Sequence, residues 1–164
     1  MGDAVSSDTY TPKQRTRYRQ RLLNDLEVFD RILQTADFID EGTIGLELEL
    51  NLVDDQMQPS RTGEAVLAEL SDEYQSEIGS FNVELNLPPH TIHGDGLSQL
   101  QSELSKRLDM VKKAANKVDS SVAMIGTLPS LTTEFLSDPA WMTRENRYRA
   151  LSNSAIEARG ELVR

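Results

Sequence analysis

Hydrophobic residues alternate with polar or small residues in two segments of the chain. The first is Thr43 to Val53, where leucine occupies the even positions from 46 to 52 and the odd positions hold Gly45, Glu47, Glu49 and Asn51. The second ends a strand-like run from Tyr74 to Leu87, where Phe81, Val83, Leu85 and Leu87 alternate with Asn82, Glu84 and Asn86. A period of two residues is typical of a β-strand that buries one face. We therefore predict two half-buried strands whose other faces are polar and carry glutamate.

Other segments show the three- and four-residue spacing of amphipathic helices. Thr11 followed by Pro12 is a helix start, because the hydroxyl caps the helix and proline fits its first position. From Pro12 to about Phe38 the apolar stripe consists of Tyr18, Leu22, Leu26, Phe29 and Leu33. A second long helix is predicted from the stripe Leu97, Leu100, Leu104, Leu108, Val111 and Val118. Shorter helices are expected at Gly63–Leu70 and from Arg144 to Arg159.

Glycine and proline mark where the strands should break. Gly79-Ser80 interrupts the run from Tyr74 to Leu87, and Pro88-Pro89 is expected to end it, since proline lacks the donor of a strand ladder. The nearly continuous apolar run from Val122 to Leu128 favours a central strand covered on both faces, with a buried helical turn as the alternative.

The strands decide the fold class. Helices and strands alternate along the chain, which alone would suggest a parallel α/β sheet. However, parallel strands are usually buried on both sides, whereas the two alternating strands here have one polar face each. We therefore predict an α+β fold with helices on one face of a mostly antiparallel sheet, and carboxylates on the other face.

Length and charge narrow the function classes. The chain has 164 residues, with 17 basic and 27 acidic ones, so its formal charge is −10. Such a surface repels phosphate backbones, which argues against general nucleic-acid binding but not against a local magnesium–nucleotide site. Cysteine is absent, which excludes disulfides and thiolate chemistry and fits a cytoplasmic protein. No apolar run reaches the ~20 residues of a membrane-spanning helix. Residues 1–10 are predicted to be a disordered tail.

The carboxylates of the alternating strands form a candidate metal site. Residues two apart on a strand lie roughly 6–7 Å from each other on one face, so Glu47 and Glu49 share a region, and Glu84 joins them if its strand pairs nearby. Clustered carboxylates cost energy unless a cation or water compensates them. Neither strand contains Lys or Arg, and Mg²⁺ takes oxygen ligands. A plain solvated strand face is the alternative, and the spacing alone does not decide between the two.

Five motifs together resemble the N-terminal part of the glutamate–cysteine ligase family, in its bacterial carboxylate–amine ligase-like branch. In chain order they read TIGLELELNLVDD, SEIGSFNVELNLPP, AMIGTLPSL, MTRENRYRAL and EARGEL, and the resemblance runs from about Phe38 to Arg164. It implies a glutamine synthetase-like catalytic domain, in which a curved antiparallel sheet holds ATP and Mg²⁺ or Mn²⁺ on one face. It also implies an acyl phosphate made from the γ-carboxylate of glutamate and attacked by an amine, such as that of cysteine in glutathione biosynthesis.

The resemblance implies four metal ligands, which are Glu47, Glu49, Glu77 and Glu84. Glu77 and Glu84 are seven residues apart, an odd offset that would place them on opposite faces of an unbroken strand. We therefore predict a bulge or turn at Gly79-Ser80 that restores a common face.

Candidate phosphate-binding residues lie near the C-terminus of the chain. Arg144, Arg147 and Arg149 surround Tyr148, and the planar fork of arginine suits phosphate. On a helix, positions 144 and 147 would share a face while 149 is turned away. The resemblance favours Arg147 as the catalytic residue, with Arg144 and Tyr148 beside it at the nucleotide. Ion pairs with the protein's own carboxylates are the alternative. His90 and His93 are expected in a loop, and Trp141 is expected to be a packing anchor.

The chain is shorter than full ligases of the resembled family, so we expect residues 11–164 to be a truncated N-terminal portion that is inactive alone. Unpaired sheet edges lead us to expect homo-oligomers. The competing hypothesis is a non-catalytic binding or assembly module that retains the scaffold and uses its exposed strands or its basic first helix to hold a partner.

Overall fold

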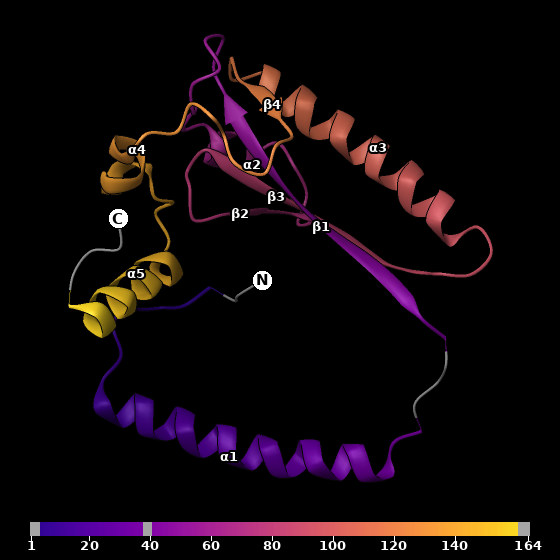
Figure 1. Cartoon of the computed structure of the whole chain (residues 1–164), viewed down its shortest axis with the longest axis vertical. Coiled ribbons are helices and arrows are strands. Elements are labelled where there is room, and N and C mark those ends of the chain that lie inside the picture. Colours follow the sequence, from indigo (N-terminus) through magenta and orange to yellow (C-terminus); the bar gives the residue numbers. More distant parts are fainter. Residues whose placement is uncertain (1–3, 38–40, 161–164) are drawn as a thin grey trace. The chain divides into compact units, whose positions relative to one another are not determined.

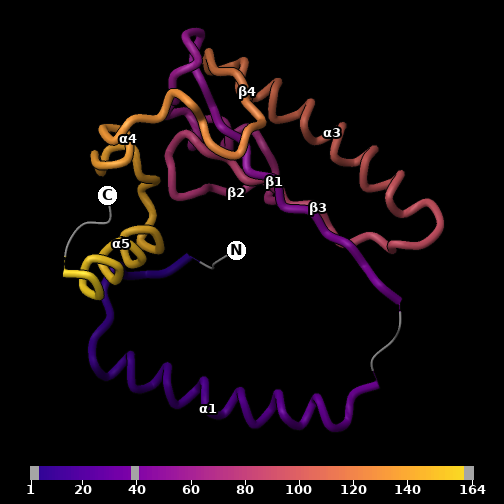
Figure 2. Tube along the Cα trace, viewed as in Figure 1, coloured from indigo at the N-terminus to yellow at the C-terminus, as the bar shows by residue number. Residues whose placement is uncertain are grey.

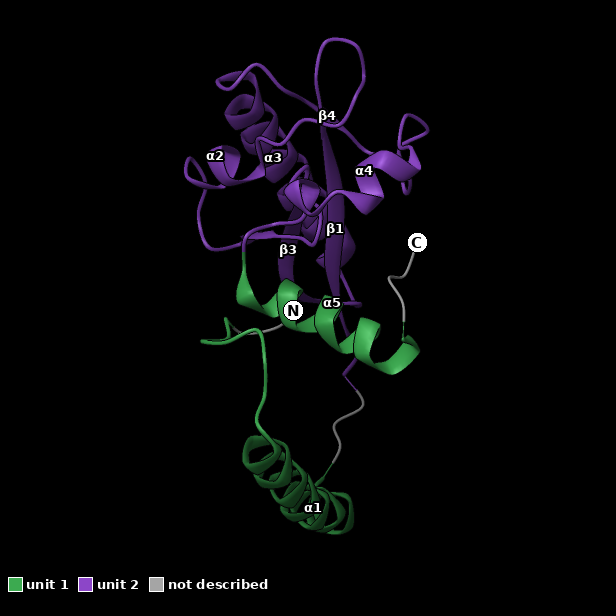
Figure 3. Ribbon diagram, turned by 90° about the vertical axis from the view of Figure 1, so that its left-hand side faces the viewer, with its two compact units in different colours: residues 1–40, 145–163 green, residues 41–144, 164 purple. Residues whose placement is uncertain are grey.

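The computed structural model describes residues 4–37 and 41–160, which fall into two compact units. Unit 1 comprises residues 1–40 and 145–163, and unit 2 comprises residues 41–144 together with 164 (Figure 3). Unit 2 holds the sheet. The predicted end of the first helix at Phe38 lies outside the described residues.

The sheet of unit 2 has four strands in the order β2-β3-β1-β4, and every neighbouring pair is antiparallel (Figure 1). Strand β1 spans Thr43–Val53, as the alternation predicted, and lies between β3 (Asn82–Thr91) and β4 (Ser121–Ala123). Strand β2 (Tyr74–Ser76) forms the other edge. The Cα trace in Figure 2 shows β1 and β3 running side by side as the two long strands.

Two helices cover the leucine face of this sheet, α2 (Gly63–Leu67) and α3 (Gly96–Asn116). The core between them contains Leu50 and Leu52 of β1, Val83 and Leu85 of β3, and Val111 of α3. Helix α3 follows the sheet along its length (Figure 1). The predicted α+β class, with an antiparallel sheet and helices on one face, is confirmed.

The prediction that Pro88-Pro89 ends the second strand is wrong. Strand β3 continues through both prolines to Thr91 and still pairs with β1, so that Ile44 lies opposite His90 and Leu46 opposite Leu87. One residue of β1, Gly45, therefore faces two residues of β3, Pro88 and Pro89, which is a β-bulge. Prolines are tolerated at a bulge because the ladder hydrogen bonds are interrupted there. As a consequence His90 lies in a strand and not in a loop.

The prediction of a central strand over Val122–Leu128 is also wrong. Strand β4 has three residues and pairs only with β1, so it is an edge of the described sheet. Met124 and Ile125 are exposed, whereas Leu128 is buried in a second small core with Val53 and Phe81. The apolar run is thus divided between a strand edge and a loop. It is followed by α4 (Thr133–Ser137) and the 3₁₀ turn η1 (Pro139–Trp141).

Unit 1 contains α1 (Pro12–Thr35) and α5 (Asn146–Arg159). Thr11 caps α1 through a reciprocal capping box with Gln14, as the Thr-Pro signal predicted. A salt bridge of 3.0 Å joins Arg15 of α1 to Glu157 of α5. Within the described residues, no helix combines the length and the apolar character needed to cross a membrane.

Candidate functional site

The pairing of β1 with β3 places three polar pairs in a row on the sheet face opposite α3. Asn51 lies opposite Asn82, Glu49 opposite Glu84, and Glu47 opposite Asn86. The leucine positions alternate with these pairs, so all three project from the same face. Side chains directly opposite each other in an antiparallel ladder have Cβ atoms ~4.5–5.5 Å apart, and like charges at such positions are destabilising. Glu49 and Glu84 form such a like-charge pair.

A turn between β2 and β3 brings Glu77 to the same place. The strand is broken at 77–81, and β2 folds back along β3 so that Gln75 lies opposite Glu84. The Glu77 carboxyl lies close enough to the Glu84 carboxyl to raise the pKa of Glu84. The predicted break at Gly79-Ser80 is therefore confirmed, and it removes the parity problem of an odd offset.

The turn is held by the segment that follows η1. The Ser80 amide donates to the carbonyl of Trp141 at 2.8 Å, and the Thr143 amide donates to the carbonyl of Ile78 at 2.9 Å. A Cβ at Gly79 would lie 2.3 Å from Oδ1 of Asn82, so a larger residue there would force the Asn82 side chain to move. These contacts fix the backbone on both sides of Glu77.

Glu84 is the most constrained carboxylate of the group. It is only 7% exposed, and its Oε1 has no hydrogen-bond partner among the described residues. Burial raises the pKa of Glu84 because water no longer solvates the charge, and the neighbouring Glu77 carboxyl raises that pKa further. The nearby Asn86 amide partly offsets the rise in pKa. Both polar atoms of the Asn86 side chain are also buried and have no hydrogen-bond partner in the described part of the chain.

The Asn51 end of the row is closed by hydrogen bonds and an apolar cluster. Asn82 donates to Oδ1 of Asn51 at 2.9 Å, and Asn51 donates to the carbonyl of Ile125 at 2.8 Å. Phe81 and Trp141 pack beyond this point, edge to face, with ring centroids 6.2 Å apart. The expectation that Trp141 is a packing anchor is confirmed. The carboxylates of Glu47 and Glu49, by contrast, are exposed.

The arrangement suits an oxygen-ligated cation. Two carboxyl groups lie close together, one of them is buried with an unpartnered oxygen, and oxygen donors are what Mg²⁺ and Mn²⁺ prefer. Across residues 4–37 and 41–160, no three acidic, histidine or cysteine side chains already converge with metal-ligand geometry. The ligand set of Glu47, Glu49, Glu77 and Glu84 stays a prediction.

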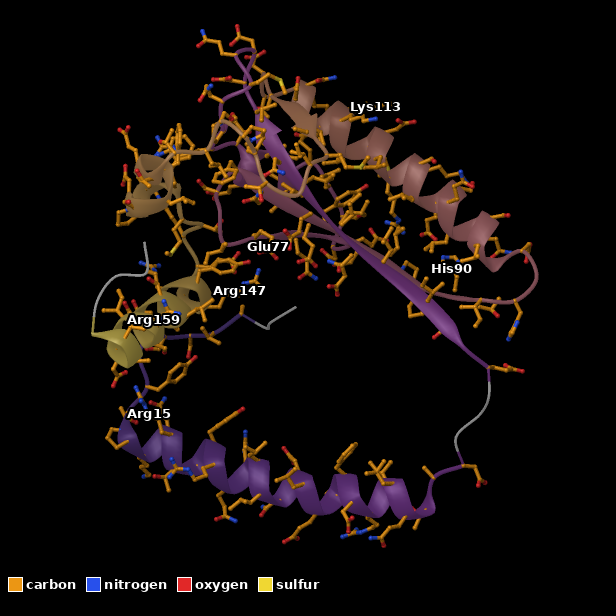
Figure 4. The ribbon with its side chains drawn as sticks, viewed as in Figure 1. Arg15, Glu77, His90, Lys113, Arg147 and Arg159 are labelled. Carbon is orange, nitrogen blue, oxygen red and sulfur yellow. The ribbon has the colours of Figure 1, made fainter. Side chains whose placement is uncertain are left out.

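The arginines near the C-terminus are arranged differently from the expectation. Helix α5 begins at Asn146, so Arg144 precedes it and the argument that positions 144 and 147 share a helix face is wrong. Arg147 lies 2.9 Å from a carboxylate oxygen of Glu145, and its guanidinium stands 4.5 Å from the centre of the Tyr148 ring. Arg149 is exposed and contacts Asn146. The side chains of Arg147 and Glu77 are labelled in Figure 4.

A second polar network, which sequence reasoning missed, lies between α3 and the sheet. Nε2 of His90 lies 2.9 Å from a Glu103 oxygen, and Arg107 binds Glu103 at 2.7 Å and Glu73 at 3.1 Å. His90 is labelled in Figure 4. The network borders a hollow of about 740 Å³. The four-residue spacing of Glu103 and Arg107 was a visible signal for one pair, but the contacts to Glu73 and His90 depend on the fold.

Comparison with known proteins gives one family. The family model of glutamate-cysteine ligase family 2 matches residues 43–164, which is most of the chain. No curated protein and no solved structure matches the sequence. The match begins at the first residue of β1 and covers the whole polar row.

Proposed function

The chain belongs to glutamate-cysteine ligase family 2, and from this membership we propose that it acts as an ATP-dependent carboxylate–amine ligase that forms a γ-glutamyl amide. The observation that carries the proposal is the buried Glu84 carboxyl, which has an unpartnered oxygen, lies opposite Glu49 in the β1–β3 ladder and is close to Glu77. Neither β1 nor β3 contains Lys or Arg. In a ligase, a bound metal–nucleotide complex would compensate these negative charges.

Glu47, Glu49, Glu77 and Glu84 would hold Mg²⁺ or Mn²⁺. When bound, the ion would neutralise charge on the phosphate oxygens of ATP while an anionic substrate approaches. The buried Glu84 fits the innermost position, since its unpartnered oxygen already faces away from water. The exposed Glu47 and Glu49 fit the side that substrate reaches.

The proposed reaction has two steps. The γ-carboxylate oxygen of glutamate bonds to the γ-phosphorus of ATP as the bond to ADP breaks, which gives an acyl phosphate. The amine nitrogen then bonds to the activated carbonyl carbon, phosphate leaves with the bonding electrons, and the amine loses a proton to solvent. With cysteine as the acceptor, the product would be γ-glutamylcysteine, which belongs to glutathione biosynthesis. We propose that the reaction takes place in the cytoplasm, where ATP is available.

Arg147 is proposed to bind phosphate. Its Nε lies 2.9 Å from a Glu145 oxygen and its guanidinium 4.5 Å from the centre of the Tyr148 ring, and these two neighbours would restrict the direction of the fork. A pre-oriented fork binds two phosphate oxygens with little loss of side-chain freedom. Arg144 is exposed and is proposed to assist at the nucleotide.

Calorimetric titration with MgCl₂ and with MnCl₂ tests the proposal at its metal site. We expect a binding isotherm for the wild-type chain that is lost or weakened at least about tenfold in Glu49→Gln, since one charged oxygen ligand is removed. Glu64→Gln, an exposed carboxylate in α2, is the matched control and should leave the isotherm unchanged. The absence of an isotherm in every variant would contradict the proposal and favour the non-catalytic module.

Turnover is tested separately. Phosphate release that needs both ATP and glutamate, and that increases with an added amine, would support the ligase reaction. A different outcome is metal binding that depends on Glu49, with no γ-glutamyl product from any of a panel of amines. This result would support the metal site and contradict the ligase reaction.

A further inference from the structure

Helix α1 carries an apolar face that the other described residues of its own unit leave uncovered. None of its 24 residues is buried. The stripe predicted from the sequence is 47 to 69% exposed, and it consists of Tyr18, Leu22, Leu26, Phe29 and Leu33. Soluble proteins seldom leave a continuous apolar surface of this kind without a partner. The stripe therefore indicates a docking surface.

The spacing of this stripe is that of a helix–helix seam. From Leu22 the apolar positions advance by four, three and four residues to Leu26, Phe29 and Leu33. Such steps keep the side chains on one line and allow them to insert between those of a second helix. A helix of 24 residues is about 36 Å long, which is enough for several layers of such contacts.

The charges of α1 are divided between its two halves. Residues 12–21 contain five basic residues and no acidic one, whereas residues 22–35 contain three acidic residues and one basic one. In a parallel pair of α1 helices the two strongly basic halves would lie together and repel each other. In an antiparallel pair each basic half lies along the acidic half of the other helix.

We propose that α1 associates with α1 of a second copy of this chain as an antiparallel helix pair. If Leu22 of each helix lies beside Leu26 of the other, position 19 of one helix lies beside position 29 of the other. Arg19 then lies one residue from Asp30 of the second copy, and the symmetry of the pair repeats this contact. The same face would attach poorly to an anionic membrane, because Asp25 and Asp30 flank the leucines while the arginines lie at the other end.

The absence of cysteine from the sequence makes orientation directly measurable. Thr16→Cys and Gln34→Cys replace exposed polar residues that are about five helical turns apart and so lie on the same side of α1. In the antiparallel pair, residue 16 of one chain lies about 3 Å along the axis from residue 34 of the other, but about 24 Å from residue 16. The two full-length variants are mixed, one of them ¹⁵N-labelled, and treated with a short bis-maleimide.

Mass spectrometry then distinguishes the products. We expect cross-links between the labelled and unlabelled variants and few within either variant alone. Efficient cross-linking of Thr16→Cys to itself and of Gln34→Cys to itself would overturn the antiparallel orientation. Absence of any cross-link at concentrations of about 100 μM, together with a monomer in sedimentation, would overturn the association itself.

A charge exchange tests the electrostatic part. Arg19→Glu and Asp30→Arg should each weaken dimerisation about five- to tenfold in sedimentation equilibrium, because each creates two like-charge contacts. The double variant should recover most of the affinity, and Asp109→Arg on α3 is the control that leaves it unchanged. Unaltered Trp141 fluorescence shows that unit 2 remains folded. Failure of the double variant to recover, or co-sedimentation of monomers with phosphatidylserine vesicles, would contradict the proposal.

Discussion

Replacement of Glu84 by glutamine should make the metal-free protein more stable and the metal-loaded protein less so. Glu84 is 7% exposed, its Oε1 has no partner among the described residues, and its carboxyl contacts that of Glu77. Glutamine keeps the size of the side chain, removes one negative charge and supplies an amide donor to the Glu77 carboxylate. In EDTA we therefore expect the variant to be more stable than the wild type.

The magnitude follows from the contacts involved. A buried polar group without a partner costs about 1–3 kcal/mol, and a hydrogen bond to a charged group contributes about 1.5–3 kcal/mol. We therefore expect Glu84→Gln to raise the free energy of unfolding by about 1–3 kcal/mol at pH 7 in EDTA. Saturating Mg²⁺ should reverse the order, because a ligand at a hundred times its Kd stabilises the wild type by about 2.7 kcal/mol.

The pH dependence has a defined sign. Because the folded-state pKa of Glu84 is raised, its neutral form is favoured in the folded protein. The stability gap between variant and wild type should be smallest below the ordinary pKa of glutamate and should widen as pH rises through the raised pKa of Glu84.

Urea unfolding followed by fluorescence is the assay, since the chain has a single tryptophan. Trp141 packs beside the 77–81 turn and therefore reports on unit 2. Glu64→Gln is the control and should change stability by no more than a few tenths of a kcal/mol. A variant that is less stable than wild type in EDTA at neutral pH, or one that keeps the full response to Mg²⁺, would refute the reasoning.

Three further predictions concern unit 2. Gly79→Ala should lower the urea midpoint and weaken Mg²⁺ binding together, because its Cβ would lie 2.3 Å from Oδ1 of Asn82 and would push away the side chain that donates to Asn51 in the polar row; binding at wild-type strength would refute this. Gly96→Ala should destabilise by about 1–3 kcal/mol through overpacking, because its Cβ would lie 1.8 Å from the carbonyl oxygen of Thr91, and circular dichroism melting would check it. Arg107→Ala should destabilise the protein mainly near neutral pH. Arg107, with His90, lowers the pKa of Glu103. The stability that the Glu103–Arg107 pair contributes is therefore present above the ordinary pKa of glutamate and is lost as pH falls through the lowered pKa of Glu103. An equal loss of stability at pH 3 and pH 7 would contradict the assigned role of Arg107.

The elements with a clear period were predictable from sequence. Leucine alternates with Gly45, Glu47, Glu49 and Asn51 along β1, so the strand and its two faces follow from the two-residue period, although its last four residues are all buried. Helix α1 begins where Thr11 and Pro12 indicate. The prediction for Val122 to Leu128 was wrong because an apolar composition indicates burial but not which element covers the residues. Here the segment is divided between an edge strand and a loop.

The candidate site was only partly predictable. Alternation showed that Glu49 and Glu84 each occupy a polar face, but their direct opposition depends on the register between β1 and β3, which a single sequence does not contain. Gly79 indicated the break that brings Glu77 to the same face as Glu84, because glycine is common in turns where a side chain would meet its neighbours. The contact of Arg107 with Glu73 joins positions 34 residues apart and could not be found from spacing.

Paramagnetic broadening by Mn²⁺ in the ¹H–¹⁵N spectrum tests the shared cation site most directly. We expect substoichiometric Mn²⁺ to broaden the amides of Glu49, Glu77 and Glu84 first, while those around Asp109 on α3 stay sharp. Glu84→Gln should abolish this selective effect. Uniform broadening over the acidic surface, or broadening centred on another part of the chain, would contradict it.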